Sequence, residues 1–177
     1  MIVIVSLFAI FLFPWNLKEI TLHDIWTAIG KTVALSLIIF TLFIKHFWRY
    51  KLFKFIIPIP YLGGEWDGVL RYDCNGRSSE KAVKLTIRQS LFHILVIMET
   101  NESISRSCSA SFNIDELRGE NEIIYSYFNQ PSSRNRDKSP IHYGATRLTI
   151  GENNAKLEGY YWTDRKTIGE LTFHKKQ

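Results

Sequence analysis

Residues 65–76 read Glu-Trp-Asp-Gly-Val-Leu-Arg-Tyr-Asp-Cys-Asn-Gly, and this stretch indicates the structural class of most of the chain. Its alternate positions follow the period of two that is typical of a β-strand with one buried face. That face would carry Trp66, Gly68, Leu70 and Tyr72. The Asn-Gly pair that closes the stretch is typical of a tight turn between strands. We therefore expect a β-hairpin here.

Seven further stretches have strand character, from alternation or from short apolar runs. They are residues 83–87, 91–98, 104–112, 123–128, 141–150, 155–162 and 168–174. Because the run 91–98 is mostly apolar, we expect that strand to be buried on both sides. Residues 151–154 and 163–166 are expected to form hairpin turns, and the polar stretch 130–140 a long loop.

Eight strands with nearest-neighbour turns predict an all-β antiparallel domain. An open sheet of this width would expose two edges, and no helix follows that could cover its face. Closure into an eight-stranded, lipocalin-like small barrel removes both problems. The interior of such a barrel is filled by side chains or holds one small ligand. A two-sheet sandwich is the alternative.

The amino-terminal third has a different composition. Residues 1–57 carry six lysines and arginines against two acidic residues, a net charge of +4, whereas the whole chain carries +5. Cations beside apolar segments indicate a membrane surface as the partner, and not DNA or RNA. Pro58 and Pro60 interrupt any helix, so we divide the chain into a membrane domain, 1–57, and a barrel domain, 58–177.

Two apolar runs predict two transmembrane helices. Residues 26–44 would reach nearly 30 Å at about 1.5 Å per residue, close to the thickness of the hydrocarbon layer. Residues 1–15 are shorter, and we expect them to complete a helical hairpin. A secretory signal peptide is the alternative, but this run has neither a basic start nor a small-residue cleavage site.

The loops give the orientation of this hairpin. The second run is followed by Lys45, Arg49, Lys51 and Lys54. The positive-inside rule then places both termini and the barrel in the cytoplasm, with a multi-pass anchor in the inner membrane. Two unpaired cysteines, Cys74 and Cys108, agree with a reducing compartment. Since two helices cannot enclose a pore, any membrane activity requires self-association of several chains.

The sequence gives little support for an enzyme. It has no glycine-rich phosphate loop, no nucleophile elbow and no close cluster of His, Cys and carboxylate residues. The five histidines are scattered, and we expect no metal and no cofactor. Glu65 and Asp67 flank Trp66 on the outward phase of their strand, where carboxylates are usually solvated.

A binding function has better support. Residues 160–167 read Tyr-Tyr-Trp-Thr-Asp-Arg-Lys-Thr and combine three aromatic rings, two threonine hydroxyls and two cations. Such rings stack on nucleobases, at roughly 1–3 kcal/mol per base, and guanidinium groups bind phosphate. Arg147 shares a phase with Tyr143 on the adjoining strand, and the phase of Arg106 allows it to point inward. These features favour an anionic aromatic ligand. The alternative is that the rings are barrel core and the cations are solvated.

Two motifs carry a resemblance to a known family. Gly63-Gly-Glu-Trp-Asp-Gly68 opens the first strand, and Gly159-Tyr-Tyr-Trp-Thr-Asp-Arg-Lys-Thr-Ile-Gly-Glu-Leu-Thr172 lies near the end. With the two apolar runs and the proline break, the whole layout resembles the SMODS-associated two-transmembrane, β-strand-rich effectors. These are membrane effectors of CBASS antiphage defence, a form of abortive infection.

The resemblance implies that the barrel senses a cyclic dinucleotide made by a partner nucleotidyltransferase. Binding would drive oligomerisation, and the clustered helices would disrupt the inner membrane and kill the infected cell. Position in the motifs implies the ligand-binding residues Tyr72, Arg147, Tyr161, Thr163, Arg165 and Thr167.

Three alternatives stay open on the sequence. The cyclic nucleotide could hold the effector inactive, so that its depletion by phage releases the activity. The barrel could instead be a membrane-tethered, lipocalin-like lipid carrier, which predicts an uncharged cavity and no inward Arg106 or Arg147. A purely structural membrane anchor would bind no small molecule.

Overall fold

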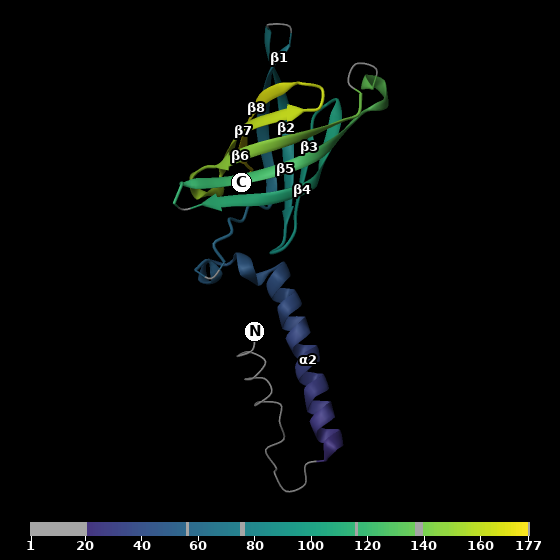
Figure 1. The fold of residues 1–177 in the computed structure, drawn as a ribbon, viewed down its shortest axis with the longest axis vertical. Coiled ribbons are helices and arrows are strands. Elements are labelled where there is room, and N and C mark those ends of the chain that lie inside the picture. The colour runs from purple at the N-terminus through teal and green to yellow at the C-terminus, as the bar shows by residue number, and fades with distance from the viewer. Residues whose placement is uncertain (1–20, 56, 75–76, 116, 137–139, 177) are drawn as a thin grey trace. The chain divides into compact units, whose positions relative to one another are not determined.

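The computed structural model describes residues 21–55, 57–74, 77–115, 117–136 and 140–176. The chain divides into two compact units, Met1–Ile57 and Pro58–Gln177 (Figure 1). Each unit is considered by itself below.

The first unit contains helix α2, Leu22–Lys45. The helix begins with a capping box, in which the Thr21 hydroxyl accepts from the Asp24 amide and the Asp24 carboxylate accepts from the Thr21 amide, at 3.3 and 3.0 Å. It ends at His46, and the short 3₁₀ turns η1, Phe47–Arg49, and η2, Lys51–Phe53, follow.

Helix α2 is long and apolar enough to cross a membrane, with a mean hydropathy of 2.0. Large apolar side chains such as Val33, Leu37 and Phe40 are exposed along it. The helix expected at 26–44 is therefore confirmed as a helix. The first expected span, residues 1–15, lies outside the described residues.

The second unit is a closed barrel in which every strand pairs antiparallel with its chain neighbours. The strands are β1 Gly64–Cys74, β2 Arg77–Gln89, β3 Ile94–Glu99, β4 Ser103–Asp115, β5 Glu120–Pro131, β6 His142–Ile150, β7 Lys156–Thr163 and β8 Ile168–Lys175. Pairing of β1 with β8, from Trp66 with Lys175 to Tyr72 with Gly169, closes the barrel. The predicted eight-stranded barrel is confirmed, and the alternative of a sandwich is wrong.

The expectation that residues 91–98 are buried on both sides is wrong. Strand β3 begins only at Ile94, after a turn that the Ser90 amide closes by donating to the His93 carbonyl at 2.8 Å. Val96 and Met98 are buried, whereas the intervening Ile97 is only half-buried. The reason is that a closed single-layer barrel has no second layer to cover its outer face.

The barrel interior is apolar and closed at one end. Its fully buried side chains include Trp66, Leu85, Ile123, Leu148, Leu157 and Phe173. Residues 58–63 close this end, because Leu62 is completely buried and its carbonyl accepts from the Trp66 indole at 3.0 Å. Gln89 fixes the segment by donating to the Pro60 carbonyl at 2.9 Å and accepting from the Leu62 amide at 2.8 Å. We call this the plugged end.

Candidate functional site at the mouth of the barrel

The opposite end, which we call the mouth, is formed by the β1–β2, β3–β4, β5–β6 and β7–β8 turns. Here the interior changes from apolar to polar. Side chains with hydroxyl, amide or amine groups point inward or line the opening: Tyr72, Lys81, Ser105, Tyr125, Tyr127, Asn129, Thr146, Tyr161 and Thr163. The same alternation that buries aliphatic residues at the plugged end therefore gathers hydrogen-bonding groups at the mouth.

Two glycines leave room for the tyrosine rings. A Cβ at Gly169 would lie 2.4 Å from the Tyr161 ring, and a Cβ at Gly144 would lie 2.4 Å from the Tyr127 hydroxyl. Tyr125 and Tyr127 lie beside each other with ring centroids 6.2 Å apart. The small residues on β6 and β8 thus determine where the rings lie.

Three polar atoms in the mouth are buried without a hydrogen-bond partner among the described residues: Tyr125 Oη, Asn129 Oδ1 and Thr146 Oγ1. Asn129 uses its Nδ2 group to donate to Ser103 and Ser105 at 3.1 and 2.8 Å, which leaves its carbonyl oxygen as a spare acceptor. Buried polar groups are nearly always paired, so such atoms indicate a polar ligand or ordered water.

Burial also changes the acidity of these tyrosines. Desolvation raises the pKa of Tyr125 to about 12, and the nearby Thr146 hydroxyl offsets only part of that rise. Desolvation, together with the nearby Tyr125 and Tyr161, raises the pKa of Tyr127 further. Both hydroxyls therefore stay neutral at physiological pH and can donate as well as accept.

Lys81 brings a positive charge to the mouth. Its ammonium lies 2.7 Å from Glu102 of the β3–β4 turn and 5.4 Å from the centroid of the Tyr72 ring. Burial by itself lowers the pKa of Lys81, but the hydrogen bond and charge of Glu102 outweigh it and raise the pKa above its usual value. Lys81 shares the inward phase of Val83 and Leu85. Lys81 was not predicted from the sequence, because the strand was expected to begin at residue 83.

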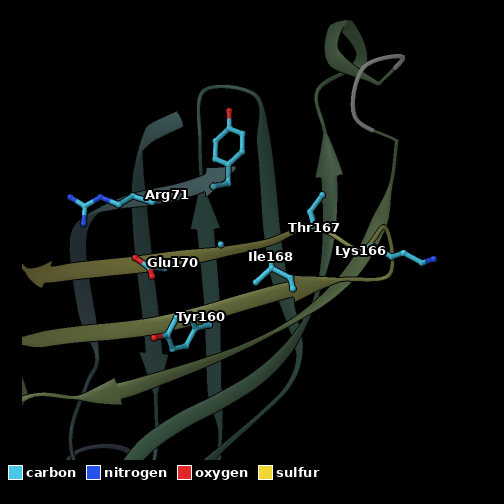
Figure 2. A pocket seen from close by; sticks show the side chains of 8 residues that line it. Arg71, Tyr160, Lys166, Thr167, Ile168 and Glu170 are labelled. Carbon is cyan, nitrogen blue, oxygen red and sulfur yellow. The ribbon is translucent and has the colours of Figure 1, made fainter. Parts of the chain in front are cut away.

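A pocket of about 570 Å³ opens on the rim beside the β7–β8 turn (Figure 2). Tyr72 lines both this pocket and the mouth interior. In Figure 2, Arg71 and Lys166 extend at opposite sides of the pocket, with Tyr160 between them. The volume is within the range of small-molecule sites, about 300–1,000 Å³.

The structure brings five of the six expected binding residues to the mouth or its rim. Tyr72 is half-buried, and Tyr161 and Thr163 are 8% exposed. Thr167 lies on the exposed rim, where its hydroxyl is 2.6 Å from that of Thr163. This hydrogen bond joins the two ends of the β7–β8 turn. Arg165 is exposed in that turn.

Arg147 does not lie at the mouth with the other five residues, contrary to the expectation from the sequence. Its neighbours Thr146 and Leu148 are completely buried, so the period of two turns the guanidinium outward. There its Nε donates to both carboxylate oxygens of Glu122, at 2.9 and 2.8 Å, and this raises the pKa of Arg147. Arg106 is exposed as well, because the buried position on that strand is Ser105.

The site offers little for metal chemistry. Across the described ranges, no group of three His, Cys, Asp or Glu side chains could hold a metal ion. Cys108 is a free, exposed thiol. The side chains at the mouth can stack, donate and accept hydrogen bonds, and bind an anion.

A small barrel with one plugged end and a polar, tyrosine-rich mouth belongs to the class of ligand-binding domains. Residues 57–175 match the family described as Cap15, cyclic dinucleotide receptor domain. The chain is also 33% identical to CD-NTase-associated protein 15 of Staphylococcus schleiferi over 147 residues, which are 83% of this chain and 78% of that relative. The chain therefore belongs to the Cap15 family, and the membership supports a CBASS effector that senses a cyclic dinucleotide.

Proposed function

We propose that this protein is a membrane-anchored CBASS effector whose barrel binds a cyclic dinucleotide, made by a partner nucleotidyltransferase, at the mouth. Binding drives self-association, and the clustered transmembrane helices disrupt the inner membrane and kill the infected cell. The protein itself carries out no catalytic step. The observation that carries the proposal is the polar mouth of an otherwise apolar barrel in a chain of the Cap15 family.

The chemistry of the mouth suits such a ligand. A cyclic dinucleotide presents two bases and two phosphodiester charges. Tyrosine rings supply surfaces for stacking, at roughly 1–3 kcal/mol per base. The unpaired Asn129 carbonyl and the hydroxyls of Tyr125 and Thr146 are suited to the polar edge of a base. At the rim, Arg165 and Lys166 supply positive charge for the phosphates.

Self-association requires a surface, and the outer face of β6–β8 supplies a candidate. Tyr143, Tyr160, Trp162 and Ile168 are 59%, 58%, 46% and 67% exposed there. Exposed apolar patches of this kind are typical of protein interfaces. Tyr160 and Ile168 also line the 570 Å³ pocket, so a ligand in that pocket would lie at the edge of this face. We assign the face to a second copy of the chain.

The first unit is suited to the membrane. Between Asp24 and Glu65 the chain has no acidic residue, whereas Lys45, Lys51 and Lys54 follow the apolar helix or lie at its end. Such a pattern favours an anionic membrane surface on the cytoplasmic side. The multi-pass topology with both termini in the cytoplasm is part of the proposal.

The experiment uses the full-length protein in vesicles of bacterial inner-membrane lipids that contain a fluorescent dye. We expect one member of a panel of cyclic dinucleotides to bind, to shift the protein to a larger oligomer and to release the dye. Trp162→Asp should bind the ligand but stay monomeric and release little dye, and Thr86→Asp, on the outer side of β2, is the matched control. Release without ligand that stops when ligand is added would contradict activation, and binding by no member of the panel would contradict the sensor function.

A further inference from the structure

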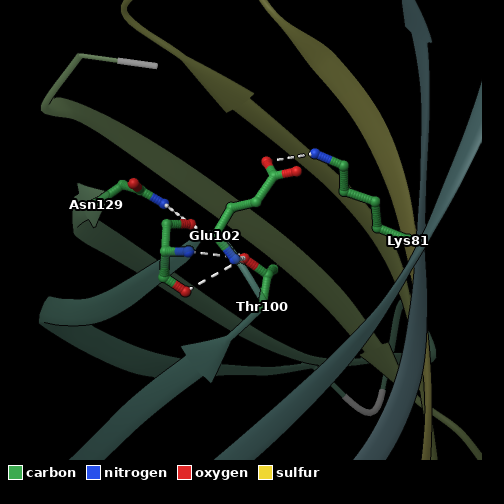
Figure 3. Close-up of polar contacts among 5 residues, drawn as sticks. Lys81, Thr100, Glu102 and Asn129 are labelled. Carbon is green, nitrogen blue, oxygen red and sulfur yellow. Dashed lines mark hydrogen bonds and ion pairs between the residues drawn. The ribbon is translucent and has the colours of Figure 1, made fainter. Parts of the chain in front are cut away.

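An ion pair joins β2 to the β3–β4 turn at the mouth. Pairing of β2 with β3 ends at Lys84 and Glu99, but β2 continues toward the mouth and carries Lys81 beyond that point. Glu102 reaches Lys81 from the β3–β4 turn, with 2.7 Å between Nζ and Oε2 (Figure 3). This side-chain contact therefore links β2 to the β3–β4 turn beyond the point where backbone pairing of β2 with β3 ends.

The turn that carries Glu102 is held by other contacts. The Thr100 amide donates to the Ser103 carbonyl at 2.9 Å, and the Thr100 hydroxyl accepts from the amides of Glu102 and Ser103 at 3.2 and 3.0 Å. The Glu102 carbonyl accepts from the Ser132 amide at 2.9 Å. Figure 3 shows the contacts of Thr100 within this turn, beside Asn129. The backbone of the turn can therefore keep its place when the carboxylate leaves Lys81.

Lys81 has the surroundings of an anion-binding group. Its ammonium lies on the inward side of β2, half-buried and 5.4 Å above the Tyr72 ring. The raised pKa of Lys81 keeps it charged at physiological pH. A carboxylate and a phosphodiester each offer one negative charge and oxygen acceptors to an ammonium, so either can occupy the same position.

We propose that Lys81 is a phosphate-binding cation inside the mouth, in addition to the cations of the rim, and that the Glu102 carboxylate occupies the position of the phosphate in the ligand-free protein. One phosphodiester of the cyclic dinucleotide displaces the Glu102 carboxylate when it binds. This inference rests on the proposed function. It adds that the Glu102 carboxylate competes with the ligand's phosphodiester for Lys81 and thereby raises the ligand concentration needed for binding.

The displaced carboxylate has other partners nearby. Glu102, Arg106 and Arg136 line one pocket of about 500 Å³ on the outer side of the mouth. Both arginines are exposed, and so is Glu102. If the Glu102 carboxylate moved from Lys81 to this pocket, it would be solvated or paired with one of the two arginines.

The test measures binding by calorimetry with full-length protein in detergent and the cyclic dinucleotide that the wild type binds. Lys81→Met should weaken binding tenfold or more, as expected for loss of a charge-assisted contact. Lys81→Arg should stay within a few-fold of the wild type, and Glu102→Gln should bind a few-fold more tightly. The matched controls are Lys84→Met and Glu99→Gln, which change the next exposed lysine and glutamate on β2 and β3. Thermal unfolding of each variant checks that it is folded.

The outcomes separate the two proposals. If the wild type binds and Lys81→Met binds equally well, the inference is overturned while the proposed function stands. Weaker binding by folded Glu102→Gln would also overturn it, because a competitor cannot strengthen binding. If the wild type binds no cyclic dinucleotide, the proposed function fails and the inference with it.

Discussion

The two ends of the barrel interior are built on the same eight strands and serve different purposes. At the plugged end, Trp66, Leu157 and Phe173 are at most 1% exposed, and Leu62 completes their packing. At the mouth, the corresponding inward positions carry tyrosine, threonine and asparagine, and three of their polar atoms lack a partner among the described residues. Alternation along the strands determines which residues face inward. The chemistry of those residues determines whether that end of the interior stabilises the fold or can bind a ligand.

The energetic consequences differ in sign. Full burial of a large apolar side chain contributes about 1.5–3 kcal/mol, so the plugged end stabilises the fold. An unpaired buried polar group costs about 1–3 kcal/mol, so the mouth destabilises it until those groups find partners. A site that lowers stability in the absence of ligand is typical of functional positions.

The largest effect is expected from a cavity at the plugged end. Phe173→Ala should lower the free energy of unfolding by about 3–5 kcal/mol, because Phe173 is completely buried. Tyr161→Phe at the mouth should change it by less than about 1 kcal/mol but weaken ligand binding. Chemical denaturation of the full-length protein in detergent measures both. Equal losses for the two variants would remove the distinction between the ends.

A matched exchange of valine and threonine should give effects of opposite sign. Val83→Thr puts a hydroxyl into the apolar part of the interior, where Val83 is 3% exposed, and should cost about 1–2 kcal/mol. Thr146→Val removes an unpaired hydroxyl from the mouth and should be neutral or stabilise by about 1 kcal/mol, with weaker ligand binding. The same denaturation assay applies. A loss of stability in Thr146→Val would show that its hydroxyl is already satisfied.

The smallest effect concerns alkaline pH. The pKa of Tyr125 is about 12 in the folded protein and near 10 when unfolded, so the stability it contributes is complete below pH 10 and is lost as pH rises toward 12. At pH 11 the loss should be roughly 1 kcal/mol relative to pH 9. Tyr125→Phe should remove this part of the pH dependence. An unchanged slope between pH 9 and 11 in Tyr125→Phe would place the alkaline effect on other groups.

The fold followed mostly from local patterns, because most strands alternate or contain a short apolar run, although β4 carries an irregularity between Ser107 and Ser109. The turn at 163–166 was also predicted from local sequence, whereas closure of the barrel was predicted because an open sheet would expose two edges and one face. Strand β3 was misjudged since a run of apolar residues carries no phase, and its outer face is covered by no second layer.

The site was predicted less completely. Thr163 and Thr167 were chosen from their motif and lie at the mouth or its rim, whereas the outward position of Arg147 was not predicted, because no local signal says which side of β6 is inside. Lys81 was missed since the charged start of β2 was left out of the strand. Asn129 was missed because it was placed at the border of an expected loop, whereas β5 continues to Pro131. Each of these depends on how far a strand extends and on its register with partners distant in sequence.

The most direct test of the receptor mouth is hydrogen–deuterium exchange of the full-length protein, with and without the cyclic dinucleotide that it binds. We expect bound ligand to slow exchange in the mouth segments, residues 127–131 and 161–169, and to leave exchange at the plugged end, residues 58–66 and 148–157, unchanged. Protection confined to the plugged end, or absent from the mouth at saturating ligand, would contradict this expectation.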